Sequence, residues 1–333
     1  MRAANKLAGW IVSAALCLGS AQPAMACAFH TYTPDPTLVD ALLATEQVVI
    51  ARRDPSDPGR YVPVETLMGP EVSEITIATG AGMRPRLAAP PGAMLLLLRD
   101  EAYGPWIEAE VLDQEFRAVI QRVLARQSAW MYENDDDRLP YFAGLVNADS
   151  PAIRRLALLE LDRAPYSDLR ALRLAGVATL KQDLESGEEA LRPICILLAG
   201  LSGEPGFVPY LNAGLNVALR DGTPYAGAYA TALIELEGAP AAHRIIRDLR
   251  DARLPVAARE KLLEALAIHY KSAPGEMRGL IAREVASSLR ATPELGEAAA
   301  RQFGFFRRWA PATQMQGGDE DAGVEDGAPQ VLQ

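Results

Sequence analysis

Residues 193–219 read PICILLAGLSGEPGFVPYLNAGLNVAL and contain the clearest pattern in the chain. An apolar run leads into the turn Ser202-Gly-Glu-Pro-Gly206, after which Leu211, Leu215 and Leu219 follow at four-residue intervals. Apolar residues at this spacing predict an amphipathic helix, and glycine with proline predicts a turn. The stretch therefore predicts two helices that pack through their apolar faces.

The same pattern returns twice in the residues that follow. The second copy pairs residues 225–236 with residues 242–249, and the third covers the apolar positions of residues 262–285. Prolines recur at intervals of 31 residues, at Pro193, Pro224 and Pro255. A fixed period of this size predicts a solenoid, in which each helical repeat stacks on its neighbours.

Three segments carry a resemblance to a known repeat family: AIRRLALLELDRA (152–164), SGEPGFVPYLNAGL (202–215) and AYATALIELEGAPAAHRIIRDL (228–249). They resemble HEAT repeats of the short kind found in bilin lyases, over residues 138–290. The resemblance implies an α-helical solenoid that presents a surface to a protein partner, and it specifies a fold rather than a reaction. The wider spacing between Pro151 and Pro193 predicts an insertion near residues 176–187.

Residues 27–112 have a different sequence pattern, in which segments rich in strand-forming residues alternate with turns of proline and glycine. A short helix over 38–43 precedes five expected strands, at residues 47–53, 60–67, 74–79, 93–99 and 106–112. Regular spacing predicts a small antiparallel β-barrel or meander. A helix from Asp113 then leads to the acidic run 133–137, which is the expected junction with a helical domain over 138–310. The predicted class is α+β with two domains.

The first 26 residues have the order of a secretory signal. Arg2 and Lys6 precede an apolar run over 7–18, and Ala24-Met-Ala26 follows. The run is shorter than the roughly 20 apolar residues that span a bilayer. We therefore expect cleavage between Ala26 and Cys27 and a periplasmic or secreted protein. A lipid anchor on Cys27 is the alternative.

A second resemblance to a known family begins at Cys27, the first residue of the expected mature chain. The segments VVIARR (48–53), RYVPVETLMG (60–69), SEITIAT (73–79) and PGAMLLLLRD (91–100) resemble the netrin and tissue-inhibitor type of OB-like barrel. The resemblance implies a barrel, although this chain has too few cysteines for the disulfides of that family. A single bridge between Cys27 and Cys195 and a buried, unbridged Cys195 are both open.

Charge and motif content restrict the classes of function. The chain has 43 acidic and 33 basic residues, a net charge of −10, which disfavours nucleic acid and anionic lipid as partners. No segment after the signal is long and apolar enough to span a membrane. The acidic segment 311–333 has no aromatic residue and predicts a disordered tail. The aromatic run 303–309 predicts a cap of the solenoid or a hook for a partner.

No common catalytic motif is present, and histidine is scarce. His243 and His269 lie on expected repeat helices, where we expect solvated side chains without a carboxylate partner. The cluster Cys27-Ala-Phe-His30 combines a thiolate, an imidazole and an α-amine, which could hold copper or zinc. The sequence thus favours an exported interaction or assembly scaffold, with a metal-binding chaperone or an enzyme using Cys27 and His30 as the alternative.

Cleavage after Ala26 gives the first test. Intact-mass analysis of the exported protein should show a chain that begins at Cys27, because the small residues before it form the cleavage site. A mass that retains residues 1–26 would contradict the prediction. A diacylglycerol increment on Cys27 would instead establish the lipid anchor.

Overall fold

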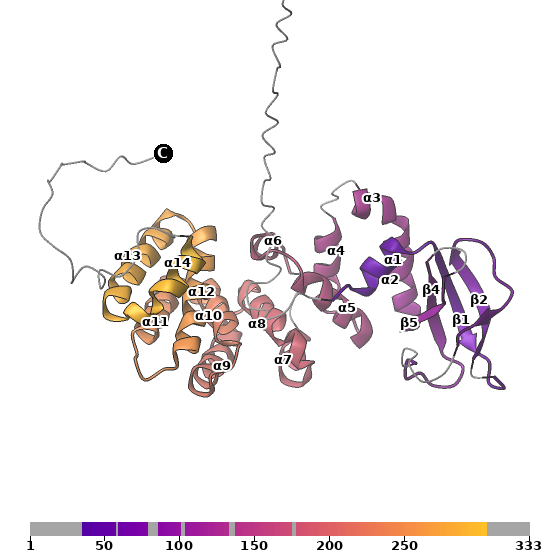
Figure 1. Cartoon of the computed structure of the whole chain (residues 1–333), viewed down its shortest axis with the longest axis horizontal. Coiled ribbons are helices and arrows are strands. Elements are labelled where there is room, and N and C mark those ends of the chain that lie inside the picture. Colours follow the sequence, from indigo (N-terminus) through magenta and orange to yellow (C-terminus); the bar gives the residue numbers. More distant parts are fainter. Residues whose placement is uncertain are drawn as a thin grey trace, which may run out of the picture.

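The computed structural model describes residues 35–57, 59–78, 86–100, 104–132, 137–174 and 178–304. Figure 1 shows an elongated chain, with a β-sheet at one end and helices that follow one another away from it. The predicted class, an antiparallel β-region followed by a helical region, is confirmed. The predicted signal, the Cys27 and His30 cluster, and the tail over 311–333 lie outside the described residues.

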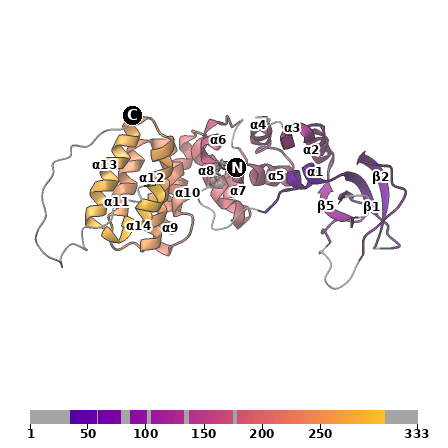
Figure 2. The same cartoon turned by 45° about the horizontal axis from the view of Figure 1, so that its top comes forward.

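Five strands form one antiparallel sheet. Their bounds are β1 (Gln47–Arg53), β2 (Arg60–Met68), β3 (Ile75–Thr76), β4 (Met94–Arg99) and β5 (Ile107–Leu112). All five strands predicted from the sequence are present, and β3 is shorter than expected. The sheet is curled, as Figure 2 shows from a second direction.

The predicted small antiparallel barrel or meander is present only in part, as a curled, open half-barrel (Figure 2). Among the described residues the strand order is β3-β2-β1-β4-β5, so β3 and β5 lie at opposite edges and are not paired with each other. With only two residues in the ladder, β3 offers too little edge to close a barrel. A meander would keep chain order, whereas here β1 occupies the centre.

The central position of β1 follows from its composition. Residues 47–51 are buried without interruption, and β4 carries a similar run over residues 95–98. Strands that are apolar on both sides are buried on both sides. Val48 and Ile50 belong to the core shared with the helices, whereas Val49 and Ala51 belong to a second core on the opposite face.

Two helices cover the first face of the sheet. The helix α1 (Leu38–Ala44) begins with a capping box, in which the Thr37 hydroxyl accepts from the Asp40 backbone and the Asp40 carboxylate accepts from the Thr37 backbone. The helix α2 (Gln114–Ala125) begins where the Asp113 carboxylate accepts from the Phe116 N–H at 2.6 Å. The longer helix expected after Asp113 is interrupted, and α3 (Gln127–Tyr132) follows separately.

The remaining helices occupy most of the second half of the chain. Their bounds are α4 (Arg138–Gly144), α5 (Pro151–Asp162), α6 (Tyr166–Ala171), α7 (Leu180–Ser186), α8 (Arg192–Leu201), α9 (Val208–Asp221), α10 (Ala226–Glu237), α11 (Ala239–Leu249), α12 (Val256–Ser272), α13 (Gly275–Ala291) and α14 (Gly296–Phe303). None of them, within the described part of the chain, has the length and apolar character needed to cross a bilayer.

The helix α10 is the centre of the helical region and contacts α8, α9, α11 and α12. Close approach depends on glycine: a Cβ on Gly200 of α8 would lie 2.5 Å from the Ala232 Cα, and one on Gly214 of α9 would lie 2.4 Å from the Tyr229 ring. Gly238, at a φ of 64°, is the single residue between α10 and α11. Such a conformation favours glycine because it has no side chain.

The register predicted for α9 can be tested by truncating its buried face. Leu215 is 5% exposed, so Leu215→Ala should lower the free energy of unfolding by about 2–5 kcal/mol through lost burial and a residual cavity. Val217 on the same helix is 44% exposed, and Val217→Ala should change that free energy by less than about 0.5 kcal/mol. Chemical denaturation measures both, and similar losses in the two variants would contradict the register.

Candidate functional site

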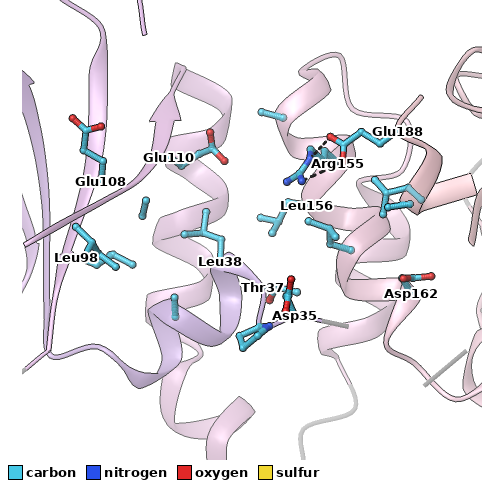
Figure 3. Close-up of a pocket in the computed structure, with 18 residues that line it drawn as sticks. Asp35, Thr37, Leu38, Leu98, Glu108, Glu110, Arg155, Leu156, Asp162 and Glu188 are labelled. Carbon is cyan, nitrogen blue, oxygen red and sulfur yellow. Dashed lines mark hydrogen bonds and ion pairs between the residues drawn. The ribbon is translucent and has the colours of Figure 1, made fainter. Parts of the chain in front are cut away.

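A cleft of about 490 Å³ lies between the edge of the sheet and α5, and we call it the junction cleft. Figure 3 shows its lining side chains, with β-strands on one side and helices on the other. The lining consists of Asp35, Pro36, Thr37, Leu38, Ala41, Leu98, Ile107, Glu108, Ala109, Glu110, Ala152, Arg155, Leu156, Leu159, Asp162, Glu188, Ala190 and Leu191. Most of these residues are apolar, and acidic residues outnumber the single basic one.

The sheet wall of the junction cleft is shaped by a β-bulge in β5. Leu96 pairs with Glu110 and the next residue, Leu97, pairs with Glu108, so Ala109 is an extra residue without a partner on β4. Side chains along a regular strand alternate, and the extra residue reverses this alternation. Glu108 and Glu110 therefore point to opposite faces of the sheet, and Figure 3 shows Glu110 directed into the cleft.

The Glu108 carboxylate is fixed on the far face of the sheet. It accepts from the Arg53 Nε and Nη2 at 2.8 and 2.7 Å, from the Tyr61 hydroxyl, and from the Leu87 backbone N–H at 2.9 Å. Burial alone would raise the pKa of Glu108, but these donors outweigh burial and lower the pKa below its usual value. Burial, followed by the hydrogen bond to Glu108, raises the pKa of Tyr61 to about 12.

The helical wall comes from α5 and the 3₁₀ helix Glu189–Leu191. Leu156 and Leu159 supply its apolar surface, while the Arg155 Nη2 lies 3.2 Å from the Glu188 Oε2 at the rim. The hydrogen bond with Glu188 is the main reason that the pKa of Arg155 is raised, and the nearby charge of Glu110 contributes. Arg155 is thus already engaged by carboxylates, and the cleft retains an acidic character.

An ionic network holds the two walls at their separation. The Arg138 Nη2 contacts the Asp40 Oδ1 at 3.1 Å and the Glu160 Oε2 at 2.7 Å, and the Thr37 hydroxyl donates to the other Glu160 oxygen. The Glu160 side chain is 2% exposed. These residues belong to the start of α1, to α4 and to α5, so the network ties the sheet-covering helix to the helical region.

The polar side chains of the lining are mainly carboxylates, with one arginine and one threonine. The lining contains no histidine, cysteine, serine or lysine in the part of the chain that the structure describes. Carboxylates are thus the groups of this lining with acid–base character. No group of three metal-ligating side chains occurs among the described residues. An apolar cleft with carboxylates at its margins is suited to an apolar ligand that carries positive charge.

None of the residues singled out in the sequence lines this cleft. Cys27 and His30 lie outside the described residues, so the predicted metal cluster and the Cys27–Cys195 bridge stay predictions, as does cleavage at Ala26. Cys195 is buried in α8, where burial, followed by the charges of Asp183 and Asp162, raises its pKa to about 12. A thiol in this state is a poor nucleophile.

The two described histidines differ from each other. His243 is exposed, as expected, whereas the expectation of a solvated His269 without a carboxylate partner is wrong. His269 is 2% exposed, its Nε2 lies 3.1 Å from the Thr231 carbonyl, and its Nδ1 lies 3.7 Å from the Glu235 Oε1. The same Glu235 oxygen accepts from Tyr166 at 2.5 Å. Contacts between α10 and α12 bury this ring, and spacing along one helix does not reveal them.

Sequence reasoning missed the cleft because its walls meet only in the folded chain. Glu110 and Arg155 lie far apart in the sequence, and neither belongs to a recognisable motif. Read as a regular strand, IEAEVL (107–112) places Glu108 and Glu110 on one face, and no local signal marks the bulge.

Comparison of the chain with protein-family models, with curated proteins and with solved structures finds no match. Function is therefore inferred from the cleft and its chemistry.

Buried His269 predicts an acid-sensitive contribution to stability. Burial, more than any other cause, lowers its pKa in the folded state, although the Glu235 charge opposes this. The unfolded chain then binds a proton more readily, so stability is lost as pH falls below about 6.5, at up to about 1.4 kcal/mol per pH unit. Unfolding followed between pH 7 and 5 should show a shallower loss for His269→Gln.

The exposed histidine provides the control for this measurement. His243→Gln makes the same chemical change at the surface and should keep the pH dependence of the unaltered chain. Equal slopes for the unaltered chain and for His269→Gln would show that His269 does not couple stability to pH.

Proposed function

We propose that this chain is an exported protein-binding module that holds an apolar, positively charged segment of a partner protein in the junction cleft. The observation that carries the proposal is the lining: leucine, isoleucine and alanine side chains between two walls, with Asp35, Glu110 and Glu188 against the single Arg155. Burial of apolar side chains would supply affinity, and the carboxylates would select for positive charge.

We infer that the helices beyond the cleft form a HEAT-like solenoid that acts as its support. The contacts favour this arrangement, because α8, α10 and α12 pack in one row and α11 packs against α13 in a second row. Repeat proteins commonly use two such rows to build extended binding surfaces. The signal expected over residues 1–26 supports export of this module to the periplasm or out of the cell.

Labelled octapeptides provide a direct test. A peptide of alternating leucine and lysine should bind the exported chain more tightly than one of alternating leucine and glutamate, and its affinity should fall as salt is added. Fluorescence anisotropy measures the dissociation constants. Equal affinities for the two peptides, or no binding by either, would overturn the proposal.

A charge variant locates the binding in the cleft. Glu110→Gln should weaken the lysine peptide about two- to fivefold, which corresponds to roughly 0.4–1 kcal/mol for a half-exposed charge pair. Glu185→Gln makes the same change at an exposed position of α7 outside the cleft and should leave the affinity unchanged. Equal effects of the two variants would place the peptide elsewhere.

A further inference from the structure

The position of β5 points to how a segment would bind, provided that the proposed function is correct. In the described part of the chain β5 pairs with β4 alone, so its other edge has no strand partner. Figure 1 shows β5 as the strand nearest the helices, so this edge faces the junction cleft. An unpaired strand edge is a template for the backbone of another extended segment.

The cleft follows this edge of the strand. Four consecutive residues, 107–110, line it. Side chains of successive residues point to opposite faces of a sheet, so a cleft over one face would be lined by alternate residues. Even with the bulge at Ala109, Glu108 faces away from the other three residues. Because the cleft is lined by all four residues although their side chains point to two faces, the backbone edge of residues 107–110 forms part of the cleft wall.

One edge donor is already occupied by a side chain. The Val111 N–H donates to the Glu110 Oε1 at 2.9 Å, so a carboxylate takes the place that a strand carbonyl would have. A backbone donor at an edge needs an acceptor, and a neighbouring side chain supplies one until a strand arrives. Arrival of a peptide carbonyl would release the Glu110 carboxylate toward a basic side chain of the peptide.

We propose that the partner segment binds as an extended strand added to the free edge of β5, with both apolar and basic side chains. Its backbone pairs with residues 107–111. Its side chains on the helical face enter the cleft, where apolar ones lie against Leu38 and Leu156 and basic ones lie near Glu110. Charge complementarity selects this occupant, because the lining is acidic and a segment with acidic side chains would be repelled.

Backbone methylation of the leucine–lysine octapeptide tests this binding mode. Two peptides are made, one N-methylated at its odd residues and one at its even residues. In an added strand only one set of N–H groups faces β5. One peptide should therefore lose affinity about tenfold or more, through lost hydrogen bonds, while the other stays within about twofold of the parent. Hydrogen exchange at the Val111 amide should slow when the parent peptide binds.

The outcomes separate this inference from the proposed function. If the parent peptide binds but both methylated peptides bind equally well and Val111 is not protected, strand addition is wrong while the binding function stands. If no peptide binds, both are overturned. If Val111 is already protected in the exported chain and deletion of residues 27–34 exposes it, the segment preceding Asp35 is the occupant and the partner peptide is not.

Discussion

The Glu160 side chain is almost fully buried, and its charge is tolerated only because Arg138 and Thr37 contact it. A buried carboxylate without such partners would cost several kcal/mol of stability. Arg138 also reaches Asp40, which belongs to the capping box of α1. The start of the helix that covers the sheet is thereby tied to α5, and the separation of the two cleft walls depends on this connection.

The same connection bears on how a ligand would be held. A single buried core runs from the sheet face through α1, α2 and α5 to the C-terminal helices. Gly200 and Gly214 let α8 and α9 approach α10 so closely that a Cβ at either position would clash. Rigid walls reduce the entropy lost on binding, so a pre-formed cleft binds more tightly than one that must be assembled. If the proposed function is correct, the packed helices contribute to recognition by supporting the cleft.

Local pattern predicted the elements well and their assembly less well. The five strands and the helices from α8 to α13 follow from periodicity and turn residues, which act over a few positions. Closure of a barrel depends on how much edge β3 offers, and burial of His269 depends on α10 packing against α12. The junction cleft depends on the meeting of β5 with α5. These features arise from tertiary contacts, and no short window of sequence contains them.

The bulge at Ala109 also affects how this strand can be compared with others. The extra residue shifts the side-chain alternation of β5 by one position. Odd-numbered residues before the bulge and even-numbered residues at Glu110 and Leu112 therefore point to the same face of the sheet. A gap-free alignment with an unbulged strand would match Glu110, which faces the cleft, to a residue on the opposite face of the sheet. Insertion or loss of one codon at this position would move an acidic group between the cleft and the far face of the sheet without substituting any other residue. The length of β5, as much as its composition, therefore decides which side chains face the cleft.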